Sequence, residues 1–86
     1  AAHYNMGVAY LSLQQYDNAQ IAFAQAEKIN PHHARAALNR GVALWELGRP
    51  TEAITAYERA LLLKPGYAPA LENLQKARSD LKAGKN

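Results

Sequence analysis

Residues 34–65 read ARAALNRGVALWELGRPTEAITAYERALLLKP, and a similar stretch precedes them in the chain. When the sequence is shifted by 34 residues, small residues fall on small residues, and apolar and aromatic residues keep their class. The identical pairs are Ala2/Ala36, Asn5/Asn39, Gly7/Gly41, Val8/Val42, Ala9/Ala43, Leu13/Leu47, Ala19/Ala53, Ala22/Ala56, Ala26/Ala60 and Pro31/Pro65. A fixed period of this length indicates a structure that is built from repeated supersecondary units.

The repeated pattern resembles the tetratricopeptide repeat. Units of that family carry a small residue early in their first helix, here Gly7 and Gly41, and a large residue one turn later, here Tyr10 and Leu44. The second helix carries alanine, an aromatic residue and alanine, and a proline closes the unit, here Ala19, Phe23, Ala26 and Pro31, then Ala53, Tyr57, Ala60 and Pro65. The resemblance covers essentially the whole chain and implies an all-α, right-handed α-solenoid of five helices in stacked antiparallel pairs.

Apolar spacing and turn residues predict where the helices begin and end. We expect helices at residues 2–13 and 18–29 in a first unit (1–33), at 34–47 and 51–63 in a second unit (34–67), and at 69–82 in a capping region (68–86). Asp17 and Thr51 are the expected N-caps of the second helices. Gly48 is the expected C-cap of the third helix.

The two ends of the chain depart from the repeat. The fifth helix has a narrow apolar stripe, and its polar outer face is typical of the terminal helix that a solenoid needs for solubility; the expected stripe is Leu71, Leu74, Ala77 and Leu81. The tail at 83–86 is expected to fray. At the other end Ala2, Met6 and Ala9 form an apolar face, which we expect to pack on a preceding repeat or on another molecule. The chain is interpreted as a fragment of a longer protein.

Composition excludes several classes of function. The chain has 86 residues, a net charge of +3 and no cysteine, so disulfides and thiolate metal sites are excluded. No apolar run approaches the roughly 20 residues that span a bilayer. The sequence shows no nucleophile with a base, no phosphate-binding loop and no paired carboxylates in an apolar setting, so we expect no enzyme activity and no cofactor. The compartment is not fixed, and the cytoplasm is the default expectation.

Histidines and arginines do not suggest metal or nucleic-acid binding. A zinc site needs three or four converging ligands, whereas His32 and His33 are adjacent and His3 is a whole unit away. A solvated loop is the expected setting of His32 and His33. The arginines are scattered over different helices and lack the clustered basic face of a nucleic-acid-binding protein; they include Arg35, Arg40, Arg49 and Arg59.

The resemblance implies a binding groove, because the first helix of each unit lines the concave side in this family. The implied groove residues are Tyr4, Asn5, Val8, Leu11, Arg35, Leu38, Asn39, Val42, Trp45, Asn73 and Lys76. Asn5, Asn39 and Asn73 recur every 34 residues, and such a row of amides resembles the ladder that holds a peptide main chain in some members. The alternative is a local hydrogen bond to the next helix. Trp45 is the expected exposed anchor of the groove, and the alternative is packing against the neighbouring repeat.

These features predict a protein-interaction module that binds a peptide segment of a partner protein. An alternative is self-assembly into a homo-oligomer through the first helix or the groove, and another is a regulatory appendage of a larger protein. Members that bind chaperone C-terminal tails hold the carboxylate with lysine, asparagine and arginine side chains. Of the corresponding positions only Asn39 matches, because the others are Tyr4, Val8, Pro69 and Asn73. We therefore expect no clamp of that type.

Overall fold

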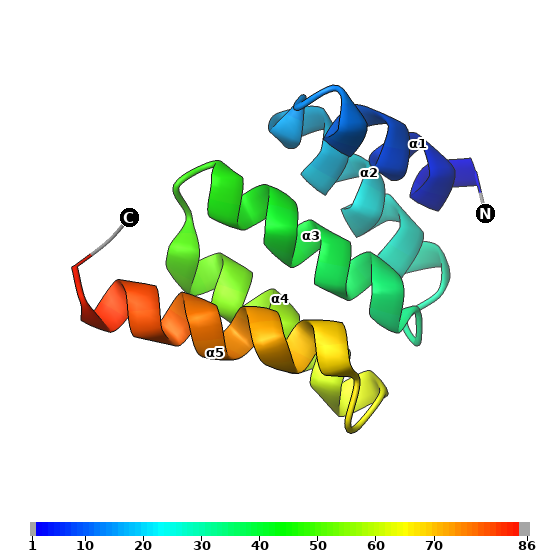
Figure 1. Ribbon diagram of the computed structural model, residues 1–86. Coiled ribbons are helices and arrows are strands. Elements are labelled where there is room, and N and C mark those ends of the chain that lie inside the picture. Colours follow the sequence, from blue (N-terminus) through cyan, green and yellow to red (C-terminus); the bar gives the residue numbers. More distant parts are fainter. Residues whose placement is uncertain (1, 85–86) are drawn as a thin grey trace.

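The computed structural model describes residues 2–84 (Figure 1). These residues form five α-helices and no strand: α1 (Ala2–Ser12), α2 (Tyr16–Ile29), α3 (Ala34–Glu46), α4 (Pro50–Leu63) and α5 (Ala68–Lys82). All five predicted helices are therefore present, and their bounds differ from the prediction by at most two residues. The expected frayed tail at 83–86 extends beyond the described residues.

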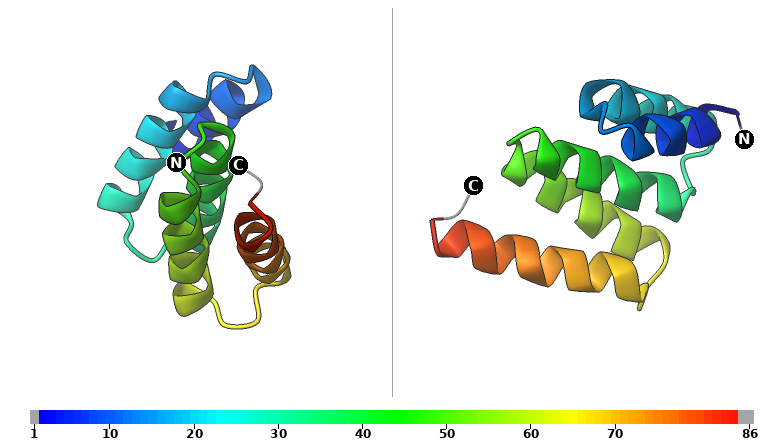
Figure 2. Two further views of the ribbon diagram at one scale, coloured as in Figure 1. Left: turned by 90° about the vertical axis from the view of Figure 1, so that its left-hand side faces the viewer. Right: turned by 45° about the horizontal axis from the view of Figure 1, so that its top comes forward.

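The helices stack in two layers. α1, α3 and α5 form one layer, and α2 and α4 form the other (Figures 1 and 2). Each helix packs against the next one along the chain, and α1 also contacts α3. The described part measures 37 × 28 × 16 Å. This arrangement places side chains of α1, α3 and α5 along one side of the molecule.

The turns after α1 and α3 are built in the same way. The backbone amide of Gln15 bonds the carbonyl of Tyr10 at 2.9 Å, and the amide of Arg49 bonds the carbonyl of Leu44 at 3.0 Å. Such a bond needs a left-handed residue just before the donor. Gly48 has φ 75° and supplies it in the second unit, where it follows the C-cap Leu47 instead of being the C-cap itself, whereas Gln14 adopts φ 60° in the first unit.

The predicted N-caps of α2 and α4 are wrong. α2 begins at Tyr16 rather than after Asp17, and α4 begins at Pro50, which lies in its first turn. The N-caps are Gln15 and Arg49, and neither makes a side-chain capping bond. The reason is the short turn: the residue whose amide closes one helix also offers its carbonyl to the next. Neither Asp17 nor Thr51 is therefore in a position to cap.

Glycines allow the two layers to approach closely within each unit. A Cβ atom on Gly7 would lie 2.5 Å from the ring of Phe23, and one on Gly41 would lie 2.6 Å from the ring of Tyr57. Phe23 is fully buried and Tyr57 is 3% exposed. The repeated glycine–aromatic contact is thus the structural reason for the repeated glycine in the sequence.

The apolar stripe of α5 is partly different from the predicted one. Leu74 and Ala77 are buried as expected, but Leu71 and Leu81 are 41% and 40% exposed, and Ala70 is buried instead. Only one face of α5 packs on the preceding helix α4, and the spacing 70, 74, 77 follows the i, i+4, i+7 pattern of a single helix face. At the other end of the molecule the apolar face of α1 is exposed as expected, over Ala2, Met6 and Ala9.

Candidate functional site

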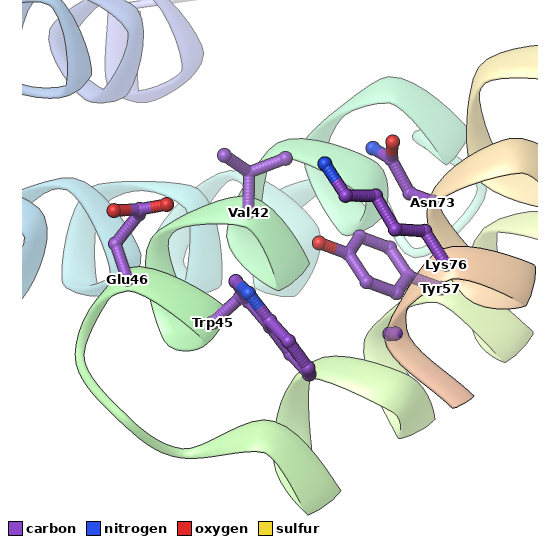
Figure 3. Close-up of a pocket in the computed structure, with 7 residues that line it drawn as sticks. Val42, Trp45, Glu46, Tyr57, Asn73 and Lys76 are labelled. Atoms are coloured by element: carbon purple, nitrogen blue, oxygen red, sulfur yellow. The ribbon is translucent and has the colours of Figure 1, made fainter. Parts of the chain in front are cut away.

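A pocket of about 280 Å³ opens between α3 and α5, with a side chain of α4 in its wall (Figure 3). Its lining combines apolar, amide and charged groups, and the residues are Val42, Trp45, Glu46, Tyr57, Asn73, Lys76 and Ala77. Four of the eleven groove residues expected from the sequence, Val42, Trp45, Asn73 and Lys76, therefore meet at one place.

Helical spacing explains how the two walls form. Val42, Trp45 and Glu46 are three and four residues apart on α3, so they share one side of that helix. Asn73 and Lys76 have the same relation on α5. Lys76 and Glu46 approach from opposite sides of Val42 (Figure 3), so the pocket carries one charge of each sign.

Trp45 combines the two alternatives that the sequence left open, which are an exposed position in the groove and packing against the neighbouring repeat. Its side chain is partly buried and packs against the core that α3 shares with α4 and α5. The same residue lines the pocket. An indole held by the core on one side and open to the pocket on the other suits an anchor, because little motion is lost when a ligand covers it.

Tyr57 is a pocket residue that was not among the groove residues expected from the sequence. Its ring is buried under Gly41, and its hydroxyl turns toward the pocket (Figure 3). Burial, with a smaller effect of Glu46, raises the pKa of Tyr57 to about 12. The first unit has Phe23 at the equivalent position. The hydroxyl that Tyr57 adds was the sequence signal that the end of this side chain reaches a polar environment.

A second group of predicted residues meets at the other end of α3. The amide nitrogen Nδ2 of Asn39 donates to the hydroxyl of Tyr4 at 3.2 Å. The ring of Tyr4 stacks on His33 with centroids 4.7 Å apart. His33 Nδ1 in turn accepts from the amide of Ala36 at 3.2 Å and caps α3. His33 is thus a half-buried cap, whereas His32 is exposed as expected of a loop residue.

The remaining predicted residues are spread along the same side. Leu38 does not line the groove, because it is 7% exposed and belongs to the core of α3, α4 and α5. Asn5 and Val8 are exposed on α1, and Leu11 is half-buried. Arg35 is exposed on the first turn of α3. Of the three recurring asparagines only Asn39 bonds a neighbouring helix within residues 2–84, so the peptide ladder stays a prediction.

Two further properties concern the described residues 2–84. They contain no group of three or more histidine, aspartate or glutamate side chains placed to hold a metal ion. No helix among them is both long and apolar enough to cross a membrane.

The chain is similar to known proteins along most of its length. It is 40% identical over 80 residues to a probable UDP-N-acetylglucosamine–peptide N-acetylglucosaminyltransferase SPINDLY of Arabidopsis thaliana, a match that covers 93% of this chain and 9% of that protein. It is 38% identical over 61 residues to tetratricopeptide repeat protein 28 of Homo sapiens, covering 71% of this chain and 2% of that protein. The chain therefore spans less than a tenth of the length of these two relatives.

Solved structures give the same result for the fold. The first TPR of Spaghetti (RPAP3) bound to the HSP90 peptide SRMEEVD superposes with a TM-score of 0.89 at 30% identity, over 93% of this chain and 64% of that one. The second TPR domain of human RPAP3 in complex with the HSP70 peptide SGPTIEEVD gives 0.86 at 34% identity, over 88% and 63%. These likenesses confirm the expected all-α, right-handed solenoid. Since the sequence profile of the tetratricopeptide repeat also matches residues 4–70, the chain belongs to the tetratricopeptide repeat family.

Proposed function

We propose that this chain is a protein-interaction module that binds a peptide segment of a partner protein on the side formed by α1, α3 and α5. The observation that carries the proposal is the pocket around Trp45, where a half-buried indole lies beside the amide of Asn73 and the amino group of Lys76. Large aromatic side chains of this kind dominate binding energy at protein interfaces.

The amides supply the second part of the mechanism. The side-chain oxygen Oδ1 of Asn39 receives no hydrogen bond within residues 2–84, and the Nδ2 atom uses one of its two N–H donors on Tyr4. Asn73 lines the pocket further along. An amide offers both a donor and an acceptor to an extended main chain. Both similar structures hold peptides, which supports the same use of this side here.

The module itself is proposed to act by binding and not by catalysis. One relative is named as a glycosyltransferase, but the match covers 9% of it. The catalytic activity of a larger parent protein is thus compatible with a non-catalytic segment, which would then position or regulate the rest of the chain.

We further propose that the chain does not use a C-terminal carboxylate clamp, although both similar structures hold chaperone peptides. Val8 and Pro69 have no side-chain donor, and Tyr4 and Asn73 bring no positive charge to pair with a carboxylate. Titration of SRMEEVD with a free or an amidated C-terminus tests this point. Equal affinity of the two forms is expected, and a clear preference for the free carboxylate would restore the clamp.

Trp45 is the only tryptophan of the chain, which permits a direct test of groove binding. A phage-displayed library of random nonapeptides without tryptophan is selected against the immobilised domain, and enriched peptides are titrated while Trp45 emission is recorded. We expect binding to change the emission. Trp45→Ala should weaken binding by on the order of 2 kcal/mol, or roughly 30-fold.

The matched control is Leu62→Ala, which removes a large apolar side chain that is 77% exposed on α4, in the opposite layer. Circular dichroism verifies that both variants fold. If the enriched peptides bind the Trp45 and Leu62 variants equally well and leave the emission of the wild type unchanged, the groove is not the site.

Self-assembly is the second candidate, and the exposed face of α1 favours it. Met6 is 46% exposed, with Ala2 and Ala9 exposed beside it. Sedimentation equilibrium of the wild type and of Met6→Glu distinguishes the cases. Association that the charge abolishes would support self-assembly, whereas a monomer at high concentration would count against it.

A further inference from the structure

Within the described residues, Arg35 differs from the other arginines of the chain in having no carboxylate partner. The five arginines all lie within the described residues. Four of them form ion pairs with glutamates, namely Arg40–Glu27, Arg49–Glu52, Arg59–Glu27 and Arg78–Glu58. Within residues 2–84 Arg35 forms no such pair and is exposed, whereas glutamates pair with each of the other four arginines.

The groups that act on Arg35 are the hydroxyls of Tyr67 and Tyr4. Hydrogen bonding to the Tyr67 hydroxyl, followed by the Coulombic effect of Tyr4, raises the pKa of the Arg35 guanidinium, and no carboxylate contributes to this effect. The amino group of Lys64 lies 4.8 Å from the ring centre of Tyr67. We call the four residues Tyr4, Arg35, Tyr67 and Lys64 the Arg35 end of the groove. It is basic, because within residues 2–84 neither Arg35 nor Lys64 forms an ion pair with a carboxylate.

Arg35 and the pocket residues Val42, Trp45 and Glu46 all lie on α3, so their spacing along that helix is known. The pocket residues of α3 run from Val42 to Glu46, seven to eleven residues after Arg35. At 1.5 Å per residue this is about 10–16 Å along the helix axis. Asn39 lies between the two ends. An extended peptide rises about 3.3 Å per residue, so three to five of its residues cover the distance.

The alternation of an extended peptide narrows this range. Successive side chains point to opposite sides, so only side chains separated by an even number of positions face the same surface. Within three to five residues the separation that satisfies both conditions is four. The charges then indicate which peptide side chain each end accepts. The Arg35 end is basic and favours an acidic side chain, whereas the pocket has Lys76 and Glu46 as charges of opposite sign and favours neither charge.

We infer that the groove selects peptides in which an acidic side chain and a large apolar side chain are four residues apart. The carboxylate pairs with Arg35, and the apolar side chain enters the pocket beside Trp45. This inference rests on the proposed peptide binding and adds the chemistry and spacing of the ligand. A side-chain carboxylate suits a guanidinium because the two planar groups form parallel, charge-assisted hydrogen bonds.

The test uses the same random nonapeptide library, selected separately on the wild type and on the Arg35→Gln variant, followed by sequencing of the enriched pools. Arg78→Gln is the matched control, because Arg78 is an exposed arginine of α5 that pairs with Glu58 of α4 and does not line the pocket. The wild type and the Arg78 variant should enrich aspartate or glutamate four positions from a leucine, methionine, phenylalanine or similar residue. The Arg35 variant should lose the acidic preference and keep the apolar one.

A synthetic peptide of the enriched sequence, acetylated and amidated, removes any contribution of terminal charges. Replacing its acidic residue by the corresponding amide should lower its affinity for the wild type about tenfold, and should change its affinity for the Arg35 variant little. If enriched peptides require Trp45 but show no acidic residue at this spacing, the inference fails and peptide binding stands. If no enriched peptide depends on Trp45, the proposed function itself fails.

Discussion

Replacement of Gly41 by alanine tests the close contact between the two helices of the second unit. A Cβ atom at this position would lie 2.6 Å and 2.8 Å from two ring atoms of Tyr57, and 3.2 Å from the carbonyl oxygen of Ala53. Ordinary contacts between carbon atoms are about 3.5–4.0 Å long. The ring must therefore move by about 1 Å, or the helices must separate.

Two opposing effects decide whether Gly41→Ala raises or lowers the free energy of unfolding. Alanine in place of glycine stabilises an exposed helix position by about 1 kcal/mol. Overpacking of a buried contact costs about 1–3 kcal/mol, and the upper part of this range applies because Tyr57 is 3% exposed and the Ala53 carbonyl is backbone. We expect a net loss of about 1–2 kcal/mol in the free energy of unfolding. For a domain of this size that corresponds to a fall in Tm of roughly 4–15 °C.

Thermal and urea unfolding, followed by circular dichroism, measures the loss. Gln25→Gly and Gln25→Ala, at an exposed position of α2, calibrate the helix-propensity term in the same protein. Tyr57→Leu creates space at the contact, so Gly41→Ala should cost at least 1 kcal/mol less in that background. A Gly41→Ala variant that is as stable as the wild type or more stable would refute the reasoning.

Three other outcomes follow from the structure. Gln14→Gly should raise stability by about 0.5–1 kcal/mol, because Gln14 has φ 60° where the second unit has Gly48, and a thermal melt that shows no gain contradicts this. The raised pKa of Tyr57, about 12 against about 10 in the unfolded chain, means that the folded state binds more protons between these values. Stability should hence be unaffected below pH 10 and fall by about 2–3 kcal/mol as the pH rises to 12, and Tyr57→Phe should remove this part of the decline in urea titrations. Glu27→Gln should cost about 1–2 kcal/mol, because the Glu27 side chain is 10% exposed and pairs with two arginines, whereas Glu52→Gln at a surface pair, 52% exposed, should cost less than about 1 kcal/mol; equal costs would mean that burial does not strengthen the Glu27 pairs.

The sequence by itself determined the fold and much of the pocket. The 34-residue period located the helices. The glycine in each first helix belongs to the repeated pattern, and the contacts of Gly7 and Gly41 give its structural reason. Four of the pocket residues were also predicted. These features depend on the repeat and on positions within one helix, and helical periodicity reports both directly.

The tertiary structure decided which of the candidate residues remain accessible and what they meet. Leu38 became core, Tyr57 brought its hydroxyl to the pocket, and Arg35 lies beside phenols from α1 and the start of α5. Periodicity cannot supply these facts, because they depend on how far each helix is rotated and shifted against helices that are distant in sequence. The 34-residue repeat makes Asn5, Asn39 and Asn73 equivalent in the chain, but packing gives each one different neighbours, and the chemistry of the groove follows from those neighbours.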